Sequence, residues 1–171
     1  MARRRSSRGG KVAVYAGSFD PVTRGHLDII ERAGELFDTL VVAVAVNPAK
    51  AGLFTPSERV DLLREELGGR SRVVVRAFEG LVVRLAAQVG ARWLVRGIRT
   101  EADAAQELPM ALSNRRCGGV EIETIFIPSR PELAFISSRL VRDIARWGGD
   151  LRPFVTPGVA RRLKALPWGR R

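Results

Sequence analysis

The sequence has little cysteine, histidine or lysine. Its 171 residues include one cysteine, Cys117, one histidine, His26, and only three lysines against 26 arginines. A lone cysteine cannot form an internal disulfide, which favours a reducing compartment. No apolar run reaches the roughly 18 residues that a membrane-spanning helix needs. The basic segment 1–11 is not followed by the apolar core of a signal peptide. We therefore expect a cytoplasmic protein with no membrane partner.

Acidic residues are missing from both ends of the chain. The net charge is +11, with five basic residues in 1–11 and six in 152–171, while residues 12–151 contain 18 basic and 18 acidic side chains. The excess charge therefore belongs to the ends, which favours solvated tails over a nucleic-acid-binding module. Binding of nucleic acid by these ends stays open as the alternative. We expect a disordered basic tail over 1–11, one domain over 12–166 and a second basic tail over 167–171.

Two common nucleotide-binding fingerprints, GxGxxG after the first strand and GxxxxGK[ST], are also absent. What is present is an alternation of strand and helix patterns. We expect strands over 12–17, 39–46, 72–78, 92–97 and 120–127. We expect helices over 26–37, 56–67, 80–90, 101–116, 137–149 and 156–166, with Pro109 kinking or splitting the fourth. This alternation predicts an α/β fold, a doubly wound, Rossmann-like, five-stranded parallel sheet in a single domain.

Ligands of such sheets bind beyond the carboxyl ends of the strands. That rule selects five loops: 17–25, 47–54, 78–80, 96–100 and 128–138. The first loop leads to His26 in the opening turn of a helix, where the helix dipole favours an anion. The other loops supply hydroxyl groups and positive charge suited to phosphate oxygens, from Lys50, Arg96, Arg99, Ser137 and Ser138.

The stretch GSFDPVTRGH, residues 17–26, resembles the (T/S)FDPxxxGH signature of the nucleotidylyltransferases. The later motifs NPAK, LFTPSER, VRGIR and FISS narrow the resemblance to the bacterial phosphopantetheine adenylyltransferases, over about residues 11–165. The resemblance implies a homohexameric enzyme of coenzyme A synthesis. It would transfer the adenylyl group of ATP, with Mg²⁺, to 4′-phosphopantetheine and release pyrophosphate and dephospho-coenzyme A. Such a transfer depends on holding two anions in line and neutralising the developing charge.

The resemblance also implies roles for individual residues. His26 would stabilise the transition state, and Ser18, Lys50 and Arg99 would assist. ATP would be bound by Ser18, Phe19, His26, Gly97, Ile98, Arg99, Glu107, Leu133, Ala134, Phe135, Ile136, Ser137, Ser138 and Arg139. Phosphopantetheine would be bound by Ser18, Lys50, Val82 and Arg96. No residue is assigned as a metal ligand, and Mg²⁺ would accompany ATP.

Another acceptor is the nearest alternative. A related nucleotidylyltransferase could act on nicotinamide mononucleotide or a polyol phosphate, and the signature at residues 17–26 does not separate these substrates. The motif VRGIR, together with Lys50, argues for phosphopantetheine.

Overall fold

The computed structural model describes residues 10–49, 51–117 and 121–168. Its centre is a five-stranded sheet with the order β3-β2-β1-β4-β5, in which every neighbouring pair is parallel. The strands are β1 (Val12–Gly17), β2 (Thr39–Val46), β3 (Val73–Glu79), β4 (Trp93–Ile98) and β5 (Glu123–Pro128). The predicted doubly wound parallel sheet is thereby confirmed.

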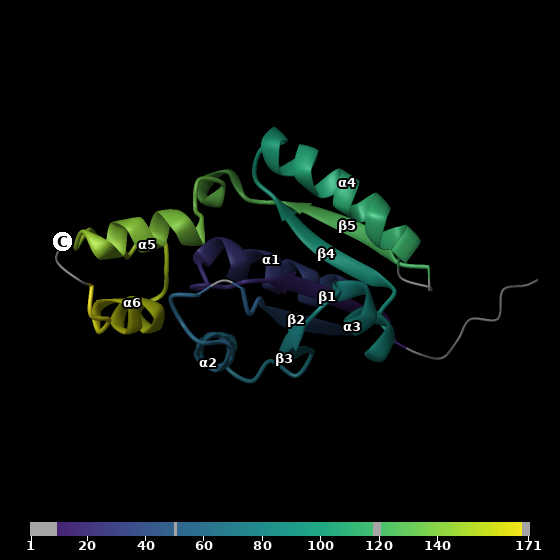
Figure 1. Ribbon diagram of the computed structural model, residues 1–171, viewed down its shortest axis with the longest axis horizontal. Coiled ribbons are helices and arrows are strands. Elements are labelled where there is room, and N and C mark those ends of the chain that lie inside the picture. The colour runs from purple at the N-terminus through teal and green to yellow at the C-terminus, as the bar shows by residue number, and fades with distance from the viewer. Residues whose placement is uncertain (1–9, 50, 118–120, 169–171) are drawn as a thin grey trace, which may run out of the picture.

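Helices cover both faces of this sheet (Figure 1). They are α1 (Arg24–Leu36), α2 (Pro56–Leu67), α3 (Val82–Gln88), α4 (Glu101–Cys117), α5 (Ser138–Arg146) and α6 (Pro157–Lys164). One apolar cluster joins the sheet to α1, α2, α5 and α6, and a second joins it to α3. Five consecutive residues of β2, from Leu40 to Val44, are buried, as expected for a strand covered on both faces.

Pro109 neither ends nor divides α4, so the expected split does not occur. The helix is continuous from Glu101 to Cys117, and none of its residues is buried. A proline inside a helix leaves the carbonyl four residues earlier without its amide partner. Here that carbonyl belongs to the exposed Ala105, so water can satisfy it. A short 3₁₀ turn, η1 (Pro131–Leu133), was also not predicted, because three residues are too few to show a periodicity.

The carboxyl ends of the strands point toward α5 and α6, while Gly10 precedes β1 at the opposite edge (Figure 1). The first and last described residues, Gly10 and Trp168, therefore lie at opposite ends of the molecule. Residues 1–9 and 169–171, which hold most of the two expected tails, lie outside the described residues. Within the described ranges, no helix combines the length and the apolar character needed to cross a bilayer.

Candidate active site

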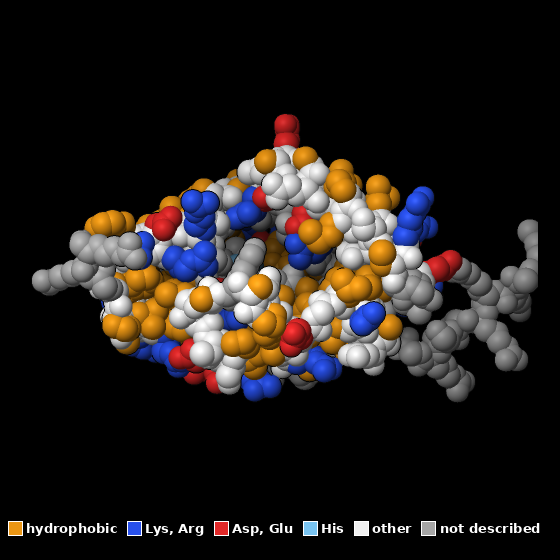
Figure 2. All heavy atoms as spheres, viewed as in Figure 1, with side chains coloured by type: hydrophobic (Ala, Val, Ile, Leu, Met, Phe, Trp, Pro, Cys, Tyr) orange, Lys and Arg blue, Asp and Glu red, His pale blue; other side chains and the backbone are white. Residues whose placement is uncertain are grey.

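A cavity of about 310 Å³ opens beyond the carboxyl ends of β1 and β4. Figure 2 shows the surface hollowed below α4, with basic and acidic side chains inside. The lining residues are Tyr15, Ala16, Gly17, Ser18, Thr23, Gly25, His26, Ile29, Arg96, Gly97, Arg99, Asp103, Glu107, Ser129, Ile136, Ser137 and Ser138. Three of the five expected loops contribute to this cavity. From the described parts of 47–54 and 78–80, no residue lines it.

His26 lies in the first turn of α1, and the main chain fixes its ring. Thr23 caps the helix, because its hydroxyl oxygen accepts a hydrogen bond from the His26 amide at 3.4 Å. In return, the Thr23 amide donates to Nδ1 of His26 at 3.1 Å. An Nδ1 that accepts a hydrogen bond carries no proton, so the neutral ring carries its proton on Nε2. The same imidazole therefore completes a capping box and leaves an N–H donor for the cavity.

The environment of His26 keeps its ring uncharged. Burial lowers the pKa of His26 to about 4, and the positive charge of Arg99 acts in the same direction. The Phe19 ring meets the imidazole edge to face, with the ring centroids 5.0 Å apart. At neutral pH the site thus presents a neutral hydrogen-bond donor at this wall, not an imidazolium ion.

The tight turn Ser18–Pro21 is held from several sides. Phe19 has a positive φ of 46°, a conformation that costs free energy for a residue with a side chain. The carbonyl oxygen of Ser18 accepts a hydrogen bond from Arg59 at 2.9 Å, and that of Pro21 accepts one from the Ser138 hydroxyl at 2.8 Å. These contacts from α2 and α5 hold Ser18 at the mouth of the cavity.

Asp20, in the same turn, connects it to the loop after β2. Its buried carboxylate accepts hydrogen bonds from the amides of Leu53 and Phe54, at 2.7 and 3.0 Å. Lys50, the proposed phosphate ligand of this loop, lies outside the described residues. The end of its loop is therefore tied directly to the GSFDP turn.

Arg96, near the end of β4, forms a two-point ion pair with Glu107 of α4. Its Nε donates to Glu107 at 2.7 Å, and Nη2 donates to the other carboxylate oxygen. Nη1 donates to the Ala16 carbonyl at 2.8 Å. Burial acts to lower the pKa of Arg96, but the hydrogen bonds and charge of Glu107 outweigh it and raise that pKa. A guanidinium has five N–H groups, so two of them stay available to an anion.

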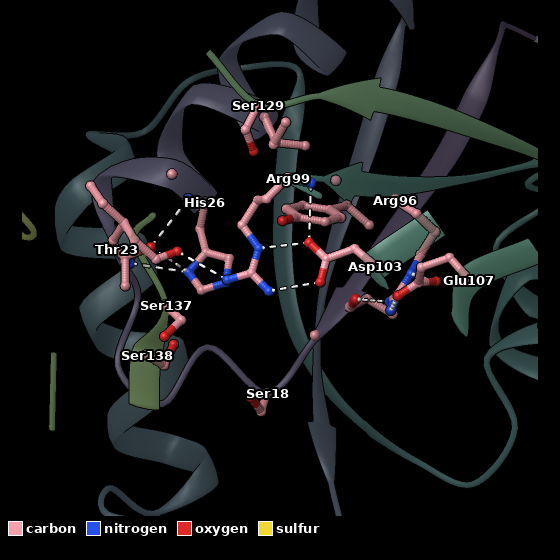
Figure 3. Close-up of a pocket in the computed structure, with 17 residues that line it drawn as sticks. Ser18, Thr23, His26, Arg96, Arg99, Asp103, Glu107, Ser129, Ser137 and Ser138 are labelled. Atoms are coloured by element: carbon pink, nitrogen blue, oxygen red, sulfur yellow. Dashed lines mark hydrogen bonds and ion pairs between the residues drawn. The ribbon is translucent and has the colours of Figure 1, made fainter. Parts of the chain in front are cut away.

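Arg99 has a matching arrangement with Asp103. Its Nε and Nη2 donate to the two carboxylate oxygens at 2.9 and 3.2 Å, and Nη1 donates to the Ile136 carbonyl at 3.1 Å. Figure 3 shows its guanidinium between the His26 ring and the Asp103 carboxylate. Hydrogen bonds from Arg99 hold the pKa of Asp103 below its ordinary value, so this pair stays charged at neutral pH.

The two serines of FISS lie at the start of α5 and line the cavity. The Ser137 hydroxyl oxygen caps this helix by accepting a hydrogen bond from the Leu140 amide at 3.1 Å. The Ser138 hydroxyl donates its hydrogen bond to the Pro21 carbonyl oxygen. Positive partial charge at the helix N-terminus thus faces the cavity.

Several predicted ligand residues lie away from the cavity. Val82 packs on the α3 side of the sheet, and Phe135 is exposed and packs edge-on against Phe154. Phe19 is buried behind the cavity wall, beside His26. The other predicted residues that do not line the cavity are Ile98, Leu133, Ala134 and Arg139.

Sequence reasoning assigned no role to Tyr15, Thr23, Ile29, Asp103 or Ser129, which all line the cavity. Asp103 had a readable signal, since it follows Arg99 by four residues at the start of a helix, a spacing that brings opposite charges together. Tyr15 had none. It lies within an apolar strand, and burial raises the pKa of its hydroxyl.

The fold and the phosphate-suited cavity define a nucleotidyltransferase of the cytidylyltransferase-like family, whose model matches residues 14–144. Two solved structures have the same fold. The nicotinic acid mononucleotide adenylyltransferase of Plasmodium falciparum has a TM-score of 0.68 at 13% identity, covering 94% of this chain and 98% of that one. A putative nicotinate-nucleotide adenylyltransferase of Vibrio parahaemolyticus has a TM-score of 0.64 at 17% identity, covering 90% of each chain.

Sequence relatives narrow the class. A phosphopantetheine adenylyltransferase of Heliobacterium modesticaldum is 45% identical over 89% of this chain and 90% of its own length. Those of Thermotoga neapolitana and a Caulobacter species are 47% and 46% identical, over 89% and 91% of this chain and 94% and 97% of their own lengths. The chain belongs to the phosphopantetheine adenylyltransferase family.

Proposed function

We propose that this chain transfers the adenylyl group of ATP to 4′-phosphopantetheine within the cavity beyond β1 and β4. The observation that carries the proposal is that three kinds of hydrogen-bond donor suited to phosphate oxygens line one cavity. These are the N–H of a neutral His26, the spare guanidinium N–H groups of Arg96 and Arg99, and the N-terminus of α5. The identity of the two substrates is inferred from the family to which the chain belongs.

The reaction is an in-line displacement at the α-phosphorus of ATP. A phosphate oxygen of phosphopantetheine forms the new bond to phosphorus while the bond to the bridging oxygen breaks, and pyrophosphate leaves with the electron pair. The attacking oxygen is already ionised, so the protein need not remove a proton from it. His26 donates its Nε2–H to the oxygen on which charge develops, an interaction that strengthens in the transition state.

The two arginines hold the substrates from the β4–α4 side of the cavity. Arg99, beside His26, binds the phosphates of ATP, and Arg96 binds the phosphate of phosphopantetheine. Each arginine keeps its carboxylate partner and offers its two remaining N–H groups. The two ion pairs cancel in formal charge. Surplus positive charge would come from Lys50 and from a Mg²⁺ ion that enters with ATP.

Mg²⁺ is usually held by substrate phosphates and few protein groups. Among the described residues, no three His, Cys, Asp or Glu side chains are grouped to hold a metal ion. Asp103 and Glu107 line the cavity and could bond to the hydration shell of such an ion. When bound, the ion would neutralise charge on the departing pyrophosphate.

We also propose that the chain forms a homohexamer in the cytoplasm. Support comes from α4, whose outward residues include exposed Leu108, Met110 and Leu112. Figure 2 shows apolar side chains over this helix. A contact between copies would cover them. Sedimentation equilibrium of the intact chain tests this assembly, and a species of one chain mass at micromolar concentration would contradict it.

A pyrophosphate-release assay with several acceptors tests the activity. Turnover is expected with 4′-phosphopantetheine and ATP, and none with nicotinamide mononucleotide. Turnover with nicotinamide mononucleotide alone would overturn the proposed acceptor. An intact, folded chain that releases no pyrophosphate with any acceptor would overturn the proposed reaction.

A further inference from the structure

A second cavity, of about 300 Å³, lies between the start of α1 and helix α6. Its lining residues are Arg24, Arg152, Val155, Thr156, Pro157, Ala160, Arg161 and Lys164. None of these residues lines the active-site cavity. Three of its four basic residues come from the acid-free stretch 152–171, whose charge the proposed reaction does not use. We call this cavity the α6 hollow.

Positive charge in the α6 hollow is poorly balanced. Among the described residues, Arg24, Arg161 and Lys164 form no ion pair with a carboxylate, whereas Arg152 pairs with Asp150 at 2.9 Å. The pKa of Asp150 is lowered mainly by Arg152, and the positive charge of Lys164 acts in the same direction.

A second carboxylate, Glu66 of α2, lies near the hollow without lining it, and it lines a neighbouring cavity that also includes Arg24. Its Oε1 lies 2.5 Å from where a Cβ would sit on Gly158, in the first turn of α6. Even with Glu66 and Asp150 counted, four cations face two anions. The hollow therefore keeps a net positive charge, which favours an anion.

Helix polarity adds to this charge. Arg24 is the first residue of α1, where the helix dipole disfavours a cation, and the first turn of α1 has no acidic residue to offset it. Thr156 and Pro157 begin α6, so the positive end of a second helix dipole also borders the hollow. An anion bound here would relieve the unfavourable placement of Arg24.

The wall that carries Arg24 is held in place. The Arg24 amide donates a hydrogen bond to the Phe154 carbonyl at 2.9 Å, and the Arg24 Nε donates one to the Arg152 carbonyl at 3.2 Å. The floor includes Val155, which is buried, and the half-buried Ala160. A cation-lined cavity with a fixed wall and a partly apolar floor suits one compact group, because it is too small for an extended polymer.

We propose that the α6 hollow is a binding site for the phosphate or pyrophosphate group of a small molecule, separate from the active site. Arg24 contacts the group from α1, and Arg161 and Lys164 contact it from α6. Because α1 also carries His26 two residues later, the bound group would touch the helix that forms one wall of the active site.

The test is a titration of the full chain with inorganic tripolyphosphate, followed by the backbone amide resonances of Ala160, Arg161 and Lys164. These resonances should shift and saturate. The double variant Arg161→Ala/Lys164→Ala should weaken the apparent affinity at least tenfold. Arg162→Ala is the matched control, because Arg162 lies on the same helix but pairs with Glu58 and does not line the hollow. It should bind like the parent chain.

Different results would overturn the site. Shifts confined to active-site amides such as Gly17 and Gly97 would place the anion in the catalytic cavity alone. Equal weakening by Arg162→Ala and by the double variant would show diffuse charge attraction instead of a site. A single-stranded oligoribonucleotide is titrated in parallel. Shifts at α6 with the oligoribonucleotide and none with tripolyphosphate would assign this surface to nucleic acid and reject the small-molecule proposal.

Discussion

The active-site cavity has two walls built on different principles. The α1 wall presents a neutral imidazole, fixed by a main-chain amide and a helix-capping threonine. The β4–α4 wall presents two guanidinium groups, each held by a carboxylate in the first or second turn of α4. The contacts that fix the imidazole stay in place when a ligand binds. Each guanidinium group, by contrast, can keep its carboxylate partner and bind a ligand with its remaining N–H groups. We therefore propose that the first wall serves the transition state and that the second wall binds substrates.

Removing the imidazole should have the largest effect. His26→Ala is expected to lower kcat about 10³-fold, with a small change in the KM for ATP, because the Nε2–H bond strengthens as charge develops. Steady-state pyrophosphate release measures both constants. A kcat near that of the parent chain would remove His26 from the mechanism and would erase the contrast between the walls.

Acid should disturb the α1 wall before the β4–α4 wall. The pKa of His26 is about 4 in the folded chain and about 6.5 when unfolded. The unfolded chain therefore binds the proton more readily, and stability is lost as pH falls from 6.5 toward 4. From pH 7 to pH 5 this loss is expected to be about 2 kcal/mol. Asp103 contributes little in that range, because its folded pKa is lowered from 3.8.

Urea unfolding at the two pH values measures this loss. The His26→Gln variant is the control, since it keeps a polar side chain but cannot titrate. If the variant loses as much stability between pH 7 and pH 5 as the parent chain, the buried neutral imidazole is not the cause.

On the charged wall, loss of one carboxylate should change substrate binding more than turnover. Asp103→Asn is expected to raise the KM for ATP about tenfold, a cost of ~1.4 kcal/mol, because Arg99 loses both ionic hydrogen bonds that orient it. The effect on kcat should be smaller. Glu101→Gln is the control, since Glu101 starts the same helix but is exposed and does not line the cavity. A fall in kcat at unchanged KM would contradict the assignment of this wall to binding.

Sequence patterns predicted the fold well because unbroken apolar runs such as residues 39–46 have few alternatives in a parallel sheet. The same logic brought residues of the first, fourth and fifth loops into one cavity, since carboxyl ends of parallel strands share an edge. The carboxylate with which each arginine forms its ion pair was not predictable from the sequence. That Arg96 meets Glu107 depends on how α4 lies against β4, which a linear spacing of eleven residues does not reveal.

Residues 133–135 show a second limit. Residues 133 and 134 precede FISS directly and Phe135 is its first residue, yet none of the three lines the cavity, although the next three residues of the motif do. The chain enters this segment from η1, which ends at Leu133. Phe135 then meets Phe154 in the segment before α6. A contact between positions 19 residues apart in irregular segments has no periodic signature in the sequence.

The smallest expected effect separates capping from catalysis at the α1 wall. Thr23 and Thr55 both complete capping boxes, at α1 beside the cavity and at α2 away from it. Replacing either with alanine should cost ~1 kcal/mol of stability. The Thr23 hydroxyl also lies 3.0 Å from Nδ1 of His26, so Thr23→Ala alone should lower kcat, by about threefold or ~0.6 kcal/mol. Equal kcat values for the two variants would show that the main-chain amide of Thr23 is sufficient to orient the imidazole, and that its hydroxyl serves only the helix.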